Sequence, residues 1–206
     1  MSPKIVDKTE KRQHIIEAAL RVFAKSGFFR TKMIHIAEAA GIGKGTIYEY
    51  FKSKEDLVKA VFDVFVVQSE IEINRRVNQF EDPVLRLNAY FETWETILNE
   101  EFIEYADIML DIWAESVRLH EGKDIFDLKS MYNKLRVQLT DILDKGMAAG
   151  SFKQVDSVVV SSVMIAALDG IFLQWLLDKK TFDPVLAIRQ MKKIFVDGVL
   201  ISQPVI

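Results

Sequence analysis

Helix-breaking residues are scarce in this chain, and their scarcity limits the folds open to it. The 206 residues include four prolines and nine glycines, and no alternating polar and apolar run of strand length stands out. We therefore predict an all-α protein. Half of the residues are hydrophobic, which is enough for a packed core and too many for a disordered chain.

Helix signals are clear in the N-terminal part. Apolar residues recur at helical spacing over residues 15–23, and Gly27 is placed to end that helix. A short second helix follows over 34–40, and a third begins near Gly43 and runs to Phe51. We expect these short helices to be joined by tight turns.

A capping signature marks the start of a long fourth helix. The Ser53 hydroxyl can accept a backbone N–H, and Asp56 lies three residues on, as in a capping box with Asp in place of Glu. We expect the boundary between an N-terminal domain, 1–55, and a larger domain, 56–206, near or inside this helix. Polar breaks define five further helices over 82–99, 102–119, 125–148, 156–178 and 184–201.

Charge is distributed unevenly along the chain. Residues 1–60 contain 12 basic and 7 acidic side chains, whereas residues 61–206 contain 15 basic and 23 acidic ones. A basic N-terminal domain suggests a polyanionic partner for that domain. Ordinary scatter of surface charge would give the same counts, so the charge pattern alone leaves both interpretations open.

Cysteine is absent from the sequence. Its absence excludes a disulfide scaffold, an iron–sulfur cluster, thiolate zinc sites and thiol catalysis. The charged N-terminal residues lack the apolar core of a secretory signal. We therefore expect a cytoplasmic protein.

The most informative stretch runs from Ile34 to Leu57. Two short helices joined at Gly41 to Gly43 make a helix-turn-helix, whose second helix can lie in the major groove of DNA. Gly41 can adopt positive φ to turn the chain, and Gly45 lets the backbone approach phosphate closely. Hydroxyl, aromatic and basic side chains suited to a sugar–phosphate backbone are left outward at Lys44, Thr46, Tyr48, Tyr50, Lys52 and Lys54.

These residues resemble the DNA-binding domain of the TetR/AcrR family of transcriptional regulators. The resemblance is carried by Gly27-Phe28, Ile36-Ala37, Ala40-Gly41 and GKGTIYEYFKSKEDL, and more loosely by 143–152 and 166–178. It implies an all-helical homodimer that binds palindromic operator DNA. It further implies a ligand-binding larger domain, and we expect a ligand-responsive regulator, most often a repressor, that an effector releases from DNA.

Carried over position by position, the resemblance assigns a set of DNA contacts. In this chain Gly43 stands where many relatives have serine, and Lys32 where a small hydroxyl residue is frequent. Glu49 either accepts from a cytosine amine or turns aside toward Lys52, and a solvated or salt-bridged side chain is favoured over a base contact. The assigned residues are Thr31, Lys32, Gly43, Lys44, Gly45, Thr46, Tyr48, Glu49, Tyr50 and Lys54.

If two DNA-binding domains are to bind one duplex, the larger domain must provide a dimer interface. The apolar segment Val158–Leu177, followed by the amphipathic helix 185–201, is the best candidate for a four-helix interface. A buried core helix within a monomer is the main alternative. A membrane span is disfavoured because Asp169 lies near the centre of the segment. The predicted interface residues are Ser162, Ala166, Asp169, Gly170, Leu173, Leu177 and Phe195.

The larger domain is rich in aromatic residues, which suits a cavity for a bulky apolar or aromatic effector. Core packing explains many of the same residues. An acidic row at Glu104, Asp107, Asp111 and Glu115 is either a solvated face or a counter-charge for a cationic effector. The predicted lining residues are Tyr90, Phe91, Trp94, Met109, Ile112, Trp113, Met131, Phe172 and Trp175.

Signals for catalysis or metal binding are weak. No nucleophile elbow, phosphate-binding loop or HExxH motif occurs. His120 lies beside Glu121 and Asp124, but a solvated loop is a better interpretation than a metal site. We predict no catalytic residues, no metal and no cofactor. The competing functional interpretations are an effector-independent DNA-binding protein and a helical interaction module that does not bind DNA.

Overall fold

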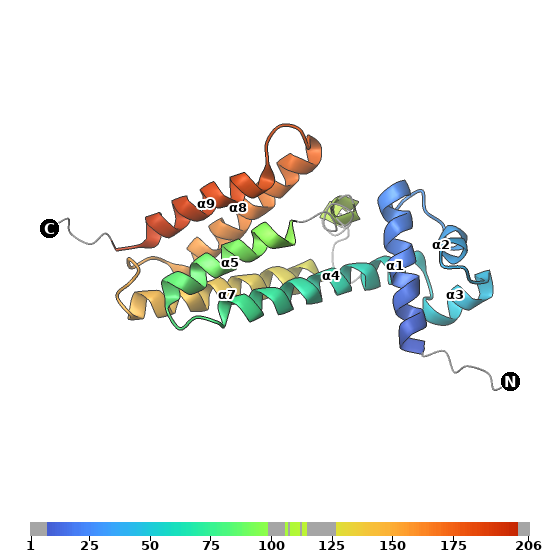
Figure 1. Ribbon diagram of the computed structural model, residues 1–206, viewed down its shortest axis with the longest axis horizontal. Coiled ribbons are helices and arrows are strands. Elements are labelled where there is room, and N and C mark those ends of the chain that lie inside the picture. The colour runs from blue at the N-terminus through green and yellow to red at the C-terminus, as the bar shows by residue number, and fades with distance from the viewer. Residues whose placement is uncertain (1–7, 99–105, 107, 112, 115–126, 202–206) are drawn as a thin grey trace. The chain divides into compact units, whose positions relative to one another are not determined.

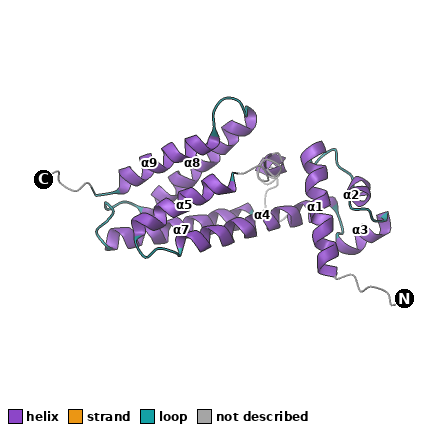
Figure 2. Cartoon of the chain, viewed as in Figure 1, coloured by secondary structure: helices purple, strands orange, loops and turns teal. Residues whose placement is uncertain are grey.

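The fold is built from helices in all parts of the chain that the structure describes. The computed structural model describes residues 8–98, 106, 108–111, 113–114 and 127–201 (Figure 1). Within these residues only helices and loops are drawn (Figure 2), so the all-α prediction is confirmed there. The helices are α1 (Lys8–Ser26), α2 (Met33–Ala39), α3 (Lys44–Tyr50), α4 (Lys54–Val77), α5 (Pro83–Ile97), α7 (Leu128–Ala148), α8 (Ser157–Leu177) and α9 (Pro184–Val199). Residues 106, 108–111 and 113–114, inside the predicted helix 102–119, are also helical.

Aspartate caps determine where three helices, α5, α8 and α9, begin. The carboxylates of Asp82, Asp156 and Asp183 each accept two backbone N–H groups of the first turn. Pro83 and Pro184 occupy the first helical position, where a missing N–H costs nothing. These local signals explain why the predicted bounds agree with the observed ones to within about one turn.

The chain packs as two compact units. The first unit comprises Met1–Val67 and Glu100–Asp127, and the second comprises Gln68–Asn99 and Leu128–Ile206. The division between the units falls inside α4, after Val67, which is within the helix where the sequence places the boundary, 12 residues after the expected end of the N-terminal domain at residue 55. A contact between distant parts of the sequence supports this grouping, because the Phe28 amide donates to Asp111 Oδ2 over 3.2 Å.

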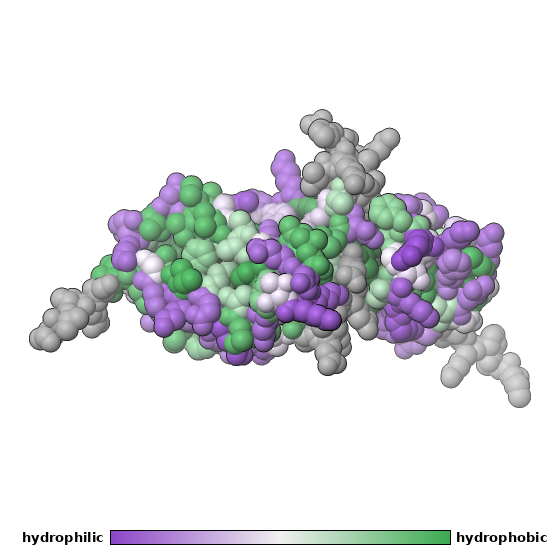
Figure 3. All heavy atoms as spheres, turned by 90° about the horizontal axis from the view of Figure 1, so that it is seen from above, coloured by the Kyte–Doolittle hydropathy of each residue, from purple (hydrophilic) through white to green (hydrophobic). Residues whose placement is uncertain are grey.

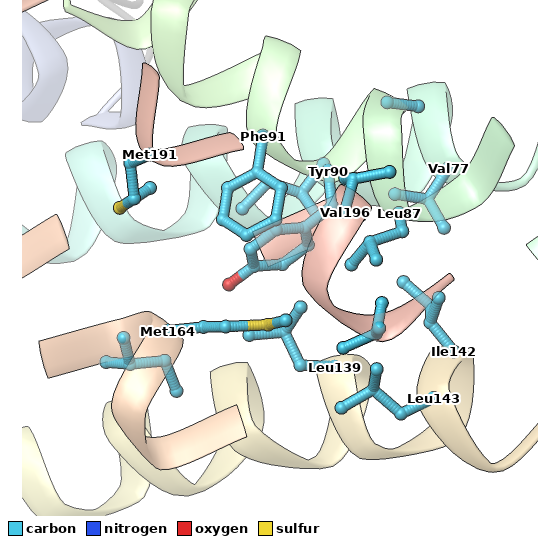
Figure 4. Close-up of a cluster of buried hydrophobic side chains, with 14 of the residues drawn as sticks. Val77, Leu87, Tyr90, Phe91, Leu139, Ile142, Leu143, Met164, Met191 and Val196 are labelled. Carbon is cyan, nitrogen blue, oxygen red and sulfur yellow. The ribbon is translucent and has the colours of Figure 1, made fainter. Parts of the chain in front are cut away.

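The core of the second unit lies among α5, α7, α8 and α9. Tyr90 and Phe91 of α5 point between these helices toward Leu139 of α7 and Met164 of α8 (Figure 4). Tyr90, Phe91, Leu139 and Met164 are completely buried. At roughly 1.5–3 kcal/mol for each large apolar side chain removed from water, this cluster is a major source of stability.

A close approach between helix and loop restricts one position near the end of α7. A Cβ atom added at Gly146 would lie 1.9 Å from Cδ2 of Phe152, so only glycine fits there. Phe152 itself is 1% exposed. Two backbone hydrogen bonds then attach this loop to the end of α9, from Lys153 to Val199 over 2.8 Å and from Ile201 to Ser151 over 3.1 Å.

Candidate nucleic-acid interface

The first unit contains the predicted helix-turn-helix, formed by α2 and α3. Ile36 and Ala37 of α2 are fully buried, as are Ile47 of α3 and, to within 1%, Phe51 at its end. Because these residues share one interior, the opposite surface of α3 has a defined orientation on the first unit. Burial of its apolar face is therefore what makes α3 a rigid element able to present polar side chains to a ligand.

The turn between the two helices is a Schellman motif. The Ile42 amide donates to the Ala37 carbonyl over 2.9 Å, and the Gly41 amide to the Glu38 carbonyl over 3.1 Å. Gly41 has φ +64°, a conformation in which a Cβ atom is unfavourable. The prediction that Gly41 turns the chain is confirmed.

The outer surface of α3 is open. Lys44 and Tyr48 are exposed, with 46% of the Tyr48 surface accessible. A Cβ atom added at Gly45 would meet no other atom within 4 Å, so nothing in the protein itself demands glycine there. Lysine and tyrosine donors around a bare stretch of backbone fit close contact with a phosphate chain.

Three further predicted contacts lie on α3. Thr46 and Tyr50 are half-buried, and Glu49 is exposed. Within the described residues Glu49 forms no ion pair with Lys52 or with any other cation. Of the favoured alternatives, a solvated and a salt-bridged side chain, the exposed Glu49 fits the solvated one.

Helix α2 and helix α3 both begin without a side-chain cap. Gly43, at the N-cap of α3, has no hydroxyl to offer, and Lys32, at the N-cap of α2, has no acceptor. At the start of α2 one backbone N–H is nevertheless satisfied, because the Lys32 amide donates to Nδ1 of His35 over 3.3 Å. The Lys32 ammonium is left exposed at the surface.

Thr31 and Lys54 are engaged inside the protein. Thr31 is 2% exposed, and its hydroxyl donates to the Gly27 carbonyl over 2.8 Å. The Lys54 ammonium donates to the Phe28 carbonyl over 2.8 Å and lies 4.2 Å from the centre of the Phe28 ring. As the structure stands, Thr31 stabilises the turn after α1 and is not available for the DNA contact that the resemblance assigned to it.

Ser53 and Asp56 cap α4 much as the sequence indicates. The Ser53 hydroxyl accepts from the Asp56 amide over 3.1 Å. Asp56 Oδ2 accepts from the Lys52 amide over 3.0 Å, one residue before the position that a standard capping box uses. The end of α3 and the start of α4 are thereby held in a fixed relation.

Most of the predicted dimer residues lie on one exposed stripe of α8. Ala166, Leu173 and Leu177 are exposed and Gly170 is half-buried, and exposed Val159 and Val163 extend the same line. The spacing alternates between four and three residues, which is the pattern of a helix that packs along a partner helix. Val159 and Val163 were not among the interface residues predicted from the sequence, although they share this spacing.

Asp169, Ser162 and Phe195 are held within their own subunit. Phe195 stacks on Phe91 with ring centres 6.3 Å apart, whereas the apolar α9 residues Leu186 and Ile194 are 53% and 69% exposed. The Ser162 hydroxyl accepts from Arg136 over 2.9 Å. Phe195 is partly buried and packs against the core of the second unit.

Asp169 is the one acidic residue of α8, and its carboxyl is partly buried. Burial raises the pKa of Asp169 to about 6, and a hydrogen bond from the Tyr132 hydroxyl opposes that rise. The same carboxylate, together with burial, raises the pKa of Tyr90 on α5. Asp169 thus faces α5 and α7 rather than the exposed stripe of α8.

The predicted effector-lining residues are not gathered around one described cavity. Tyr90 and Phe91 are core residues in edge-to-face contact, with ring centres 5.7 Å apart. Phe172 and Trp175 pack against each other on the buried side of α8, with ring centres 6.0 Å apart. Of the predicted set, only Tyr90 also lines the cavity described below.

The remaining lining candidates are divided between the two units. Trp94 and Met131 are half-buried in the second unit, and Trp94 packs against its core. Met109, 7% exposed, and Trp113 belong to the first unit. Ile112 lies outside the described residues.

A cavity of about 280 Å³ opens between α4, α5 and α7 of the second unit. Its walls combine apolar side chains with amides and one ion pair, between Arg86 and Asp141. The sequence analysis did not predict this site, because its residues come from three helices and share no motif.

The acidic row and the histidine loop are only partly described. Asp111 accepts the hydrogen bond from Phe28, whereas Glu104, Asp107, Glu115 and His120 lie outside the described residues, as do Glu121 and Asp124. Among the described residues no three metal-binding side chains cluster.

Comparisons with known proteins agree with this architecture. Residues 15–61 match the profile of bacterial regulatory proteins of the tetR family, and residues 86–200 match that of BetI-type transcriptional repressors, C-terminal part. The fatty acid metabolism regulator protein of Bacillus subtilis is 24% identical over 197 residues, 93% of this chain and 97% of that protein. The HTH-type transcriptional regulator TtgR of Pseudomonas putida is 28% identical over 179 residues, 82% of this chain and 81% of that protein. A transcriptional regulator from Saccharomonospora viridis, solved in complex with choline, superposes with a TM-score of 0.82 at 20% identity, covering 95% of this chain and all of that one.

Proposed function

Because this chain belongs to the TetR family of bacterial transcriptional regulators, we propose that it is a repressor whose homodimer binds a palindromic operator through α3. A small molecule bound in the second unit releases the protein from DNA. The cytoplasm is the compartment in which such a protein acts. The match of residues 86–200 to BetI-type repressors supports repression over activation.

The observation that carries the proposal is the surface of α3. Ile47 is fully buried against the first unit while Lys44 and Tyr48, its neighbours along the helix, are exposed around the open backbone of Gly45. This arrangement offers a lysine charge, a hydroxyl and peptide groups to the sugar–phosphate backbone at one side of the DNA groove. Such groups set position on DNA, and side chains reaching base edges set sequence preference.

A second copy of the chain is the partner that the α8 stripe fits. Val163, Leu173 and Leu177 are 50%, 40% and 74% exposed in the single subunit. Hydrophobic residues gather on the face of the second unit that carries α8 and α9 (Figure 3). An exposed apolar surface of this kind marks an interaction site, and a two-fold axis would pair the stripe with itself.

Helix α8 is also long and apolar enough to cross a membrane, with 17% of its most apolar window buried in the single subunit. The pairing of two such helices accounts for this property without a membrane. The partly buried carboxyl of Asp169 on the same helix would oppose insertion into lipid.

The relatives do not fix the effector. One is named for fatty acid metabolism, and one structural neighbour was solved with choline, an organic cation. We propose a small effector with a hydrophobic or aromatic part, because the second unit supplies mainly aliphatic and aromatic walls. An effector-independent DNA-binding protein would keep the α3 surface and lack any ligand response.

The test of the DNA interface is a double substitution, Lys44→Ala with Tyr50→Ala. An operator is first selected from random duplexes with the wild-type protein, and binding is followed by fluorescence anisotropy. The variant should bind at least about 100-fold more weakly, because each change removes a contact from both subunits. Loss of Lys44 from two subunits should also lower the slope of log K against log salt concentration by about 1.8.

The matched control is Lys25→Ala, which removes an exposed lysine from α1. It should leave both affinity and salt slope nearly unchanged. Operator binding by the double variant equal to that of the wild type would reject α3 as the reading element. Failure to select any duplex with the wild type would favour a helical interaction module.

A further inference from the structure

The cavity between α4, α5 and α7 combines an apolar wall with a cation. Val77 and Ile142 line it and are largely buried, and Arg86 of α5 contributes a guanidinium group. The volume of about 280 Å³ lies just below the roughly 300–1,000 Å³ typical of pockets for drug-sized ligands. A small molecule with a few apolar carbons is the size of ligand that it can hold.

The charge of Arg86 is poorly neutralised by its protein partner, although most of the side chain is buried. Its side chain is 17% exposed, and its Nη2 lies 3.5 Å from Asp141 Oδ2. That separation is longer than the roughly 2.7–2.9 Å of a strong charge-assisted hydrogen bond. The Nε atom is buried and has no hydrogen-bond partner in the described part of the chain.

Asp141 is already neutralised by another residue. Lys145, one turn along α7, donates to the same Oδ2 atom over 2.8 Å. Arg86 and Asp141 line the cavity, and with Lys145 beside Asp141 the three side chains carry one net positive charge. A cationic ligand would be repelled there, whereas an anion would complete the charge balance.

Neutral donors lie beside this charge. Gln138 of α7 donates to Asn74 Oδ1 of α4 over 2.9 Å, which orients the Asn74 amide and leaves its N–H groups for another acceptor. Both residues line the cavity. A carboxylate near Arg86 could thus accept from a guanidinium and from an amide, while its hydrocarbon part contacts Val77 and Ile142.

We propose that this cavity binds a small organic carboxylate with an aliphatic or aromatic tail. The inference rests on the proposed function, in which such a molecule is the effector. The cavity lies on α4, α5 and α7, so a dimer formed through α8 and α9 leaves it free. Helix α4 runs without interruption from the cavity wall to Lys54 in the first unit.

The experiment uses the full-length protein with hexanoate and phenylacetate as probes at millimolar concentration. Hexanamide and phenylacetamide match their shape without the charge, and hexylamine reverses the charge. Thermal shift and isothermal titration calorimetry should show that the two carboxylates stabilise and bind the protein. The amides should bind at least about tenfold more weakly, since each lacks the charged hydrogen bond to Arg86.

Three variants locate the effect. Arg86→Gln should weaken carboxylate binding at least about tenfold, and Asp141→Asn, which removes the competing anion, should strengthen it by about threefold or more. Arg189→Gln is the matched control, since Arg189 pairs with Glu95 over 2.7 Å and does not line the cavity. If Arg86→Gln does not fold, the stronger carboxylate binding expected for Asp141→Asn still tests the proposal.

Operator binding without any probe is measured in parallel, so the two proposals fail separately. Loss of binding to all DNA would reject the proposed function and leave the carboxylate titrations interpretable by themselves. Normal operator binding with no response to either carboxylate would overturn the cavity proposal. Equal stabilisation of the protein by an amide and by its matching carboxylate would also overturn the proposal. So would equal carboxylate binding by the wild-type protein and by Asp141→Asn.

Discussion

At the scale of single residues, two glycines of the first unit are glycine for different reasons. Gly41 has φ +64°, which an L side chain tolerates poorly, although its surroundings are open. Gly45 is helical and equally open. The protein's own fold therefore requires glycine at 41, whereas at 45 only an external partner could require it.

Gly41→Ala should lower the free energy of unfolding by about 1–2 kcal/mol, the cost of a left-handed alanine. Gly45→Ala should raise it by up to about 1 kcal/mol, since alanine is the better helix former. Gly45→Ala should nonetheless bind operator more weakly, because the added methyl separates backbone from phosphate. Urea unfolding and anisotropy measure the two effects. Undiminished operator binding by Gly45→Ala would show that the backbone does not approach DNA at this position.

Asp169 makes stability depend on pH. Its folded-state pKa, raised to about 6 by burial, exceeds the ordinary value of 3.8. The native state therefore holds the proton more tightly than the unfolded state. The stability contributed by protonated Asp169 is fully present below about pH 4 and is lost as the pH rises through about 6.

Asp169→Asn should remove this dependence and, at neutral pH, stabilise the protein by about 1–2 kcal/mol after allowance for partial solvent screening. The measurement is the free energy of unfolding of both proteins at several pH values from about 4 to about 7. The difference between them should grow as pH increases. Parallel curves would mean that Asp169 is solvated in the native state.

At the scale of secondary structure elements, one close contact determines which residue fits at position 146, near the end of α7. Alanine at position 146 would favour the helix by up to about 1 kcal/mol. The added Cβ would meet the Phe152 ring at 1.9 Å, and overpacking of this kind costs about 1–3 kcal/mol or more. The clash therefore outweighs the helix preference.

We expect Gly146→Ala to destabilise the protein by about 2 kcal/mol in urea unfolding. The double variant Gly146→Ala with Phe152→Leu should recover part of that loss, because the smaller side chain leaves room for the methyl group. Gly198→Ala is the matched control, since a Cβ there meets no atom within 4 Å. Equal stability of Gly146→Ala and wild type would show that the loop after α7 moves freely.

At the scale of the whole molecule, the proposed operator binding depends on a dimer. Leu173 on α8 and Leu85 on α5 are exposed to a similar degree, 40% and 48%, but only Leu173 lies on the α8 stripe. Charged substitutions at these two positions therefore separate the loss of an interface from a general effect of surface charge.

Leu173→Glu should raise the dimer dissociation constant at least about 100-fold, because the symmetric interface loses two buried leucines at roughly 1.5–3 kcal/mol each. Light scattering coupled to size-exclusion chromatography should then show a monomer at micromolar concentration, with operator binding reduced in proportion. Leu85→Glu should remain dimeric. A dimeric Leu173→Glu protein would place the interface elsewhere.

Local interactions explain why much of this molecule could be predicted from its sequence. Helix bounds follow from caps such as Asp82 and Ser53 and from glycines such as Gly41, whose effects are confined to a few neighbouring residues. The helix-turn-helix follows for the same reason, since its spacing and apolar positions lie within one continuous segment. Sequence alone thus determined the helices, the exposed polar surface of α3 and the apolar character of α8.

Only the tertiary structure decided which side chains are free and which are engaged. Thr31 and Phe195 carry the residue types expected at interfaces, yet one is bound to Gly27 and the other stacks on Phe91. The cavity at Arg86 arises where three helices meet across long stretches of sequence. Such contacts depend on the packing of distant segments, which the periodicity of a single helix does not encode.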